Sequence, residues 1–371
     1  MNNKPIKKKE IFDILKGIKI KNLISEKIDV INSEGRFLTN NIQSLINLPP
    51  FRNSAVDGYA IRDTDVELEK ELSIKHRIVA GDDHKVTLLK GEVARIFTGA
   101  KMPHNSNTVV MQENVTFNNN KIKINKKPFV GENCRLAGED IIKNQIIMKA
   151  GEKIITKNIS LLAAIGKHLI EVKERISVGY FTSGNELFNP SETLIGSQIN
   201  NSNQYALHSL LNKTYIDSKY LGVLKDSKEI VADSLLKNLD KNSVILTAGG
   251  ASVGEEDYLV DAIKSNGELF FWQIAIKPGR PLAIGKIDKT IIICLPGNPV
   301  SVYLLFGMII KPFLEFLCGS KMTLPKNYIA KANFSMKKLI DLESFFFDLW
   351  SFLPSRSIAR PLPVGKFRNR S

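Results

Sequence analysis

The chain has 371 residues, which is enough for two or three domains that each bury a core. Its hydrophobic content of 43% and charged content of 24% are typical of a folded soluble protein. The net charge of +14 comes from lysines scattered along the chain, without a helix-turn-helix or RNA-binding signature. We therefore expect no nucleic-acid partner, and an anionic small molecule is the other partner class that this charge favours.

No apolar leader follows the lysine-rich N-terminus, and the longest apolar run, residues 300–310, is too short to span a bilayer. We therefore expect no membrane partner. The cysteines Cys134, Cys294 and Cys318 fit no zinc or disulfide spacing. This usage indicates a reducing, cytoplasmic environment.

The first half of the chain predicts helices and then short strands. Apolar residues recur at helical spacing over residues 8–32, and residues 38–47 predict a second short helix that Pro49 and Pro50 end. Short apolar segments separated by glycine and asparagine over residues 72–130 predict a small all-β region. Residues 146–172 predict a strand, a helix and a strand.

Three polar motifs of this half, NSAVDGYA, FTGA and RLAGEDI, have two interpretations each. Asp57 beside glycine is typical of a turn, and Thr98 lies where a strand runs into a glycine turn. Arg135 and Asp140 belong to a charged loop that is typical of solvated surface. The functional alternative is an oxygen-rich ligand site in which Arg135 binds an anion and the carboxylates hold Mg²⁺.

From residue 175 onward the pattern alternates between strands and helices. The predicted strands are 176–182, 216–223, 243–247, 269–276 and 291–295. The predicted helices are 201–212, 228–238, 257–265 and 300–317. This alternation predicts a parallel sheet with helices on both faces.

Three of these strands end in similar glycine loops, which lie within FTSGNEL, TAGGASVGEEDY and LPGNPVS. Glycines allow backbone N–H groups to close on an anion, and a helix N-terminus adds a positive dipole. We expect the three strands to be neighbours, so that the loops form one anion cradle at the carboxyl edge of the sheet. The cradle residues are Thr182, Gly184, Glu186, Gly249, Gly250, Ser252, Gly254, Asp257, Pro296, Gly297, Asn298, Pro299 and Ser301.

The segment IKPGRP carries Lys277 and Arg280 on a turn constrained by Pro278 and Gly279. A guanidinium fork and a point charge beside glycine loops suit a phosphate or another oxyanion. The alternative is two exposed surface cations.

Six of these motifs resemble those of the molybdopterin molybdenumtransferases, which are related to the C-terminal domain of gephyrin. In chain order within residues 1–340 they are NSAVDGYA, FTGA, RLAGEDI, TAGGASVGEEDY, IKPGRP and LPGNPVS. The resemblance implies a multi-domain α/β plus β fold with four parts. These are a helical and extended linker domain (1–47 plus 141–175), an inserted β domain (48–140), an α/β molybdopterin-binding domain (176–325) and a C-terminal β-barrel (326–371). The barrel would be incomplete, because members usually continue further, and we expect a truncated chain.

The reaction implied by the resemblance is insertion of molybdate into adenylylated molybdopterin, with Mg²⁺ as cofactor and release of AMP to give molybdenum cofactor. Members are homodimers with a composite active site shared between two chains. The implied catalytic residues are Asp57, Thr98, Glu186, Asp257 and Lys277, and the implied metal ligands are Asp57, Asp140, Glu186 and Asp257. The implied substrate-binding residues are Arg135, Arg280 and the remaining cradle residues. Which carboxylate binds metal and which acts as base stays open, as does the choice between molybdate and tungstate.

Two positions depart from the family pattern. Asn185 stands where many members carry Asp, and Gln273 stands where some carry Lys. These departures and the short barrel leave a second hypothesis, a binding or scaffold homologue with weakened chemistry. A third, the related adenylyltransferase, is typically a single α/β domain, and the β insert argues against it.

Overall fold

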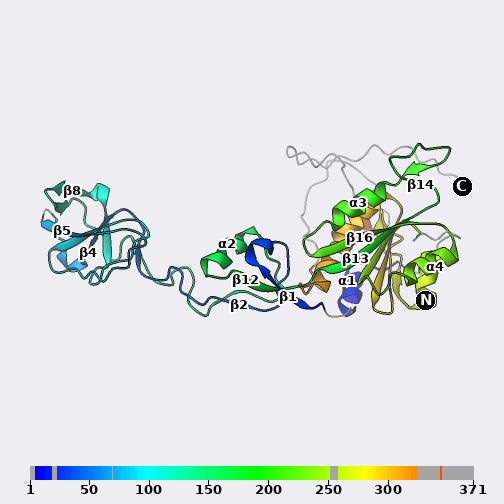
Figure 1. Cartoon of the computed structure of the whole chain (residues 1–371), viewed down its shortest axis with the longest axis horizontal. Coiled ribbons are helices and arrows are strands. Elements are labelled where there is room, and N and C mark those ends of the chain that lie inside the picture. The colour runs from blue at the N-terminus through cyan, green and yellow to red at the C-terminus, as the bar shows by residue number, and fades with distance from the viewer. Residues whose placement is uncertain (1–4, 19–22, 69, 251–257, 324–342, 345–371) are drawn as a thin grey trace. The chain divides into compact units, whose positions relative to one another are not determined.

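A computed structural model of the chain describes residues 5–18, 23–68, 70–250, 258–323 and 343–344 (Figure 1). The chain divides into two compact units. The first contains residues 1–40, 150–155 and 169–371, and the second contains residues 41–149 and 156–168. The four-domain boundaries stay a prediction. The expected barrel at 326–371 lies outside the described residues, apart from the two residues of β22 (Glu343–Ser344).

The first unit is built on a six-stranded sheet in the order β16-β13-β17-β21-β20-β18. Its first four strands are parallel: β16 (Ile216–Leu224), β13 (Ile176–Ser183), β17 (Val244–Ala248) and β21 (Thr290–Leu295). The last two run antiparallel to their neighbours: β20 (Ala283–Ile287) and β18 (Glu268–Trp272).

The prediction of an all-parallel sheet is therefore wrong at this edge. β20 was not predicted, and only two residues join it to β21, which permits an antiparallel hairpin but no crossover. The predicted strand 269–276 also ends early, because Gln273 has a φ of 69° and turns the chain. The short strand β19 (Ile276–Lys277) leaves the sheet and pairs with β22.

Helices cover both faces of this sheet, as predicted (Figure 1). Alternate residues of one strand point to opposite faces, so Leu246 packs in one apolar cluster and Ile245 in the other. The first cluster includes α1 (Lys8–Gly17), α3 (Ser202–Leu211), and the continuous run α6 (Pro299–Leu305), η4 (Phe306–Ile310) and α7 (Lys311–Leu317). The second includes α4 (Lys228–Leu236) and α5 (Tyr258–Asn266).

The continuous helix Pro299–Leu317 is, among the described residues, long and apolar enough to cross a membrane by length and composition. Its residues Leu305, Ile309 and Phe313 are fully buried in the first apolar cluster. Each such side chain contributes about 1.5–3 kcal/mol of burial free energy. Packing within the sheet domain accounts for this apolar character.

Of the two helix predictions near the N-terminus, the first holds only for Lys8–Gly17 and the second is wrong. The helix expected over residues 8–32 ends at Gly17, and the chain then forms β1 (Ser25–Asp29) and η1 (Val30–Asn32). The segment 38–47 contains β2 (Ile42–Gln43) and no helix. Each strand finds a partner more than a hundred residues away, β12 (Leu169–Lys173) for β1 and β11 (Ile146–Met148) for β2, and this pairing overrides the local helical pattern.

The second unit contains a six-stranded sheet in the order β7-β4-β6-β5-β9-β8, and this confirms the β-rich prediction. Its strands are β4 (Gly58–Ile61), β5 (Glu71–Ile78), β6 (Glu92–Ile96), β7 (Thr108–Met111), β8 (Val115–Asn118) and β9 (Lys121–Ile124). The remaining elements are β3 (Asn53–Ser54), η2 (Asp63–Asp65), η3 (Gln112–Asn114), β10 (Cys134–Arg135) and α2 (Thr156–Ala164) here, and β14 (Leu187–Phe188) and β15 (Ile199–Asn200) in the first unit.

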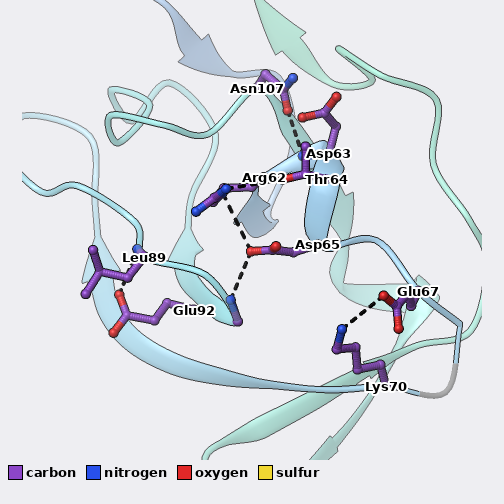
Figure 2. Close-up of polar contacts among 10 residues, drawn as sticks. Arg62, Asp63, Thr64, Asp65, Glu67, Lys70, Leu89, Glu92 and Asn107 are labelled. Carbon is purple, nitrogen blue, oxygen red and sulfur yellow. Dashed lines mark hydrogen bonds and ion pairs between the residues drawn. The ribbon is translucent and has the colours of Figure 1, made fainter.

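A buried carboxylate fixes the end of β4 (Figure 2). The Oδ2 atom of Asp65 accepts a hydrogen bond of 2.9 Å from the backbone N–H of Gly91 and lies 3.7 Å from Nε of Arg62. The backbone N–H of Asp63 donates to Oδ1 of Asn107 over 3.0 Å. These bonds tie the end of β4 to two other segments, and the other end of β4 directly follows Asp57.

Candidate active site

The three glycine loops meet at the carboxyl edge of the sheet, because β13, β17 and β21 are neighbours there. This adjacency confirms the prediction. The loops touch through their backbones. A Cβ atom on Gly249 would lie 2.4 Å from the carbonyl oxygen of Ser183, and one on Gly297 would lie 3.7 Å from Cα of Gly249. Gly249 also has a φ of 105°, which side-chain-bearing residues rarely adopt, so glycine is required at this crossing.

Two asparagines at the start of α3 form hydrogen bonds to the first and third glycine loops. Nδ2 of Asn201 donates to the hydroxyl of Thr182 over 2.8 Å, and Nδ2 of Asn203 donates to the carbonyl oxygen of Gly297 over 2.7 Å. The Thr182 hydroxyl also lies 3.0 Å from the hydroxyl of Tyr220. Thr182 is fully buried, so it supports the first loop from beneath. Sequence analysis missed Asn201, Asn203 and Tyr220, since nothing in the local pattern links α3 to the third loop.

Two buried polar atoms under the loops lack a hydrogen-bond partner within the described part of the chain, Oγ1 of Thr247 and Oδ1 of Asn203. Leaving such a group unsatisfied costs about 1–3 kcal/mol. Groups of this kind are rare in folded proteins, and each calls for a specific explanation, of which a functional site is one. Thr247 lies near the end of β17, just before the second loop, and Asn203 lies against the third loop through its bond to Gly297.

Two carboxylates flank the first loop. The Glu186 carboxylate packs over Gly184, where an added Cβ would lie 2.4 Å from Oε2. The backbone N–H of Asn185 donates to Oδ2 of Asp226 over 3.2 Å, and the backbone N–H of Asp226 donates to Oδ1 of Asn185 over 3.4 Å. Sequence analysis missed Asp226, although it follows β16 at the same edge. Asn185 therefore joins two loops of the site.

The predicted residues Ser252, Gly254 and Asp257 lie outside the described residues. Within the described ranges, no group of three His, Cys, Asp or Glu side chains could hold a metal ion. Glu186 and Asp226 are hard oxygen donors, which is the ligand type that Mg²⁺ prefers.

The third loop caps the helix that follows it. Oδ1 of Asn298 accepts a hydrogen bond of 2.9 Å from the backbone N–H of Val300, and Pro299 occupies the first turn of α6. Ser301 is buried, whereas Gly297 is exposed. Asn298 is therefore the N-cap of α6, and Pro296 precedes it as the first residue after β21.

The two cations of IKPGRP are both exposed. Neither Lys277 nor Arg280 forms an ion pair with a side chain that the structure describes. The backbone N–H groups of Ile274 and Leu282 both donate to the carbonyl oxygen of Arg280, each over 2.9 Å. The turn is thus held by its backbone, and its two charges have no side-chain partner among the described residues.

In the second unit, Thr98 binds Asp57 twice. Its hydroxyl and its backbone N–H both donate to Oδ1 of Asp57, over 2.8 and 2.9 Å. The backbone bond, then the hydroxyl bond and to a smaller extent the charge of Arg95, hold the pKa of Asp57 below its ordinary range. Asp57 therefore stays ionised well into acidic pH, with one oxygen fixed.

Arg135 and Asp140, which we predicted as an anion ligand and a metal ligand, bind each other. Nη2 of Arg135 donates to Oδ2 of Asp140 over 2.7 Å, and Nε donates to Oε1 of Glu139 over 3.4 Å. The bond to Asp140 is the main cause that raises the pKa of Arg135. An anion bound to Arg135, or a metal ion bound to Asp140, would have to compete with this ion pair. The two roles stay predictions.

Two family models match almost the whole described chain. Residues 7–166 match the "MoeA N-terminal region (domain I and II)", and residues 179–315 match the "Probable molybdopterin binding domain". The first match ends at residue 166, and the second begins at residue 179, within β13. The predicted start of the α/β domain, residue 176, lies between the two.

Curated relatives cover most of the chain as well. A molybdopterin molybdenumtransferase of Haemophilus influenzae is 32% identical over 85% of this chain and 79% of its own length. One of a Nostoc species is 33% identical over 80% of this chain and 70% of its own length. The crystal structure of a molybdopterin biosynthesis MoeA protein from Pyrococcus horikoshii aligns with a TM-score of 0.71 at 31% identity, covering 85% of this chain and 81% of that one.

Proposed function

This chain belongs to the molybdopterin molybdenumtransferase family, and from this premise we propose that it inserts molybdate into adenylylated molybdopterin and releases AMP. The product is the molybdenum cofactor. The observation that carries the proposal is the contact of the glycine loops at one sheet edge, where Gly249 lies against Ser183 and Gly297.

The glycine cradle suits the pyrophosphate of the adenylylated substrate. Its loops lack bulky side chains at their crossing, so backbone N–H groups can approach the phosphate oxygens. Asn201 and Asn203 keep the loops in place through their bonds to Thr182 and Gly297. In this role the cradle binds and orients the substrate.

Molybdate is a substrate here, and its double negative charge needs cations that are not already paired. Lys277 and Arg280 suit this role, because they are exposed on a turn held by its backbone and form no ion pair with the side chains that the structure describes. We assign them to oxyanion binding in the α/β domain. Gln273, which lies on the same segment, leaves the site with one cation fewer than in those members that carry Lys there.

We propose Mg²⁺ as the cofactor, with Glu186 as a ligand and Asp257 completing the set. Asp226 is a further oxygen donor next to the first loop. The bound ion would neutralise charge on the pyrophosphate. The chain's own carboxylates would place it, and the choice between metal ligand and proton acceptor among them stays open.

We also propose a homodimer with a composite active site, in which Asp57, Thr98, Arg135 and Asp140 of one chain serve the cradle of the other. The Asp57–Thr98 pair supports this, since it presents a half-buried, ionised carboxylate with one oxygen fixed by an exposed threonine. Three free thiols support a cytoplasmic location, and the packing of helix 299–317 in the core supports the absence of a membrane partner.

The scaffold alternative is not favoured. The relatives at 32% and 33% identity carry the enzyme's name, and Asp57, Thr98, Glu186 and Lys277 are all retained. The deciding experiment incubates the purified chain with adenylylated molybdopterin, molybdate and Mg²⁺, and measures AMP by chromatography. We expect AMP release that depends on both molybdate and Mg²⁺. A folded protein that binds the substrate and releases no AMP would favour the scaffold.

A further inference from the structure

Two arginines of the second unit stack on the same aromatic ring. The guanidinium carbon of Arg77, on β5, lies 4.8 Å from the ring centroid of Phe97, and that of Arg95, on β6, lies 4.8 Å from the same centroid. Arg77 and Arg95 are also directly opposite each other in the parallel β5–β6 pair. Phe97 directly precedes Thr98. Two positive charges are thus held together at the end of β6, next to the Asp57–Thr98 pair.

Arg95 is fixed by neutral partners. Its Nη1 donates to the carbonyl oxygen of Gly58 over 3.2 Å, and its Nη2 donates to Oε1 of Gln112. It also lies 5.1 Å from the ring centroid of Tyr59. None of these groups carries a negative charge, so the position of Arg95 is defined while it forms no direct ion pair with a side chain that the structure describes.

Arg77 is exposed, and apart from its stacking on Phe97 its guanidinium group makes no hydrogen bond or ion pair with any residue of the described ranges. Like charges directly opposite each other on neighbouring strands repel. Stacking on an aromatic ring offsets only part of this at an exposed site. An anion bound between the two guanidinium groups would remove the repulsion.

We propose that Arg77 and Arg95 form a binding site for a doubly charged oxyanion beside Asp57 and Thr98. Arg77 is the contacting group, because its free guanidinium fork can donate to two oxygens of a tetrahedral oxyanion at once. Arg95 is the fixed positive charge behind it. The inference rests on the proposed function, which supplies two sources of this chemistry, free molybdate and the phosphates of the adenylylated substrate.

The test measures binding without turnover. The full chain is titrated calorimetrically at low ionic strength with molybdate and, separately, with inorganic pyrophosphate. We expect Arg77→Gln to weaken the binding of at least one of them about tenfold, since it removes a charge-assisted bidentate contact. Arg77→Lys should bind with intermediate affinity, because it keeps the charge and loses the fork.

The matched control is Lys90→Gln, which removes one exposed positive charge from the turn before β6. That turn lies at the other end of β5, where the backbone N–H of Ser73 donates to the carbonyl oxygen of Gly91 over 3.0 Å. We expect Lys90→Gln to bind both anions with wild-type affinity. An equal loss in this control would show a general effect of net charge and would overturn the site.

The titrations with molybdate and with pyrophosphate distinguish the two sources of the oxyanion. A loss confined to molybdate assigns the site to the metal oxyanion, and a loss confined to pyrophosphate assigns it to the substrate's phosphates. Wild-type affinity of Arg77→Gln for both anions overturns the proposal. If Arg77→Gln does not fold, the comparison of Arg77→Lys with wild type decides in the same way. Absence of AMP release would contradict the proposed function and leave these binding results standing.

Discussion

Thr98 binds one carboxylate oxygen of Asp57 with both of its donors, the hydroxyl at 2.8 Å and the backbone N–H at 2.9 Å. The two residues are 41 positions apart in the sequence, and the start of β4 and the end of β6 bring them together. Because both bonds end on Oδ1, the other oxygen of Asp57 has no bond from Thr98. Thr98 therefore fixes the position of this carboxylate and is the main cause of its lowered pKa.

Replacing Thr98 by Val removes the hydroxyl bond and keeps the backbone bond, so the pKa of Asp57 should rise towards its ordinary value. The acid limb of the pH–activity profile should then move to higher pH, and AMP release should fall at least about tenfold. Since the folded pKa of Asp57 is depressed, its contribution to stability is present above the unfolded pKa and is lost as the pH falls through the folded pKa. In the variant the folded pKa lies closer to the unfolded pKa, so the pH range over which Asp57 contributes to stability becomes narrower and the contribution smaller.

The control is Thr116→Val, which removes an exposed hydroxyl that donates to Asn125 Oδ1 over 3.0 Å in the same unit. We expect wild-type activity and an unshifted pH profile. Thermal unfolding of both variants should stay within about 2 °C of wild type. An unshifted acid limb in Thr98→Val would contradict the role given to its hydroxyl.

Gly184→Ala should displace the carboxylate of Glu186 without changing Glu186 itself. The added Cβ would lie 2.4 Å from the carboxylate oxygen Oε2, so the carboxylate must move away from the loop. If Glu186 is a ligand of Mg²⁺, the half-saturating Mg²⁺ concentration for AMP release should rise about tenfold or more. Gly196→Ala is the control, because Gly196 has a positive φ of 63° and no atom within 4 Å of the added Cβ. Equal Mg²⁺ dependence in the two variants would argue against Glu186 as a ligand.

Gly249→Ala should prevent the first and second loops from closing on each other. The added Cβ meets the Ser183 carbonyl oxygen at 2.4 Å, and the φ of 105° adds strain. We expect the affinity for AMP, measured by titration, to fall below detection. Gly222→Ala is the control that separates backbone strain from the steric collision. Gly222 has a similar φ of 115°, but no atom lies within 4 Å of the added Cβ. It should lower the unfolding temperature by a few degrees and keep AMP binding.

Much of the α/β fold followed from local pattern. The segments around Val178, Leu207 and Leu235 each carry their own apolar period, and they form β13, α3 and α4 close to the predicted bounds. The failures depend on distant partners. Ile28 has helical spacing to its neighbours, yet it lies opposite Ile170 in a strand pair. Pairing across 142 residues is not visible in a window of ten, and the same holds for β20 beside β21.

The candidate site also contains residues that the local sequence predicts and residues that only the topology brings together. The glycines of the three loops are local signals at strand ends, and their meeting could be predicted from the parallel order. Asn203 acts on Gly297, which is 94 positions away, and Arg77 meets Arg95 only through the β5–β6 register. Such pairs are defined by topology, and a single sequence contains no sign of them. Asp226 is an intermediate case, because its place after a parallel strand was available as a signal.

The Arg135 pair offers a last prediction, since its guanidinium binds two carboxylates unequally. Asp140 Oδ2 lies 2.7 Å from Nη2, whereas Glu139 Oε1 lies 3.4 Å from Nε. If Asp140 serves the reaction, Asp140→Asn should lower AMP release more than about tenfold, and Glu139→Gln should keep it within about threefold. Both should unfold within about 2 °C of wild type, because partly exposed ion pairs contribute at most about 1 kcal/mol. Equal activity losses would mean that the pair only holds the loop, and Asp140 would then have no role beyond positioning Arg135.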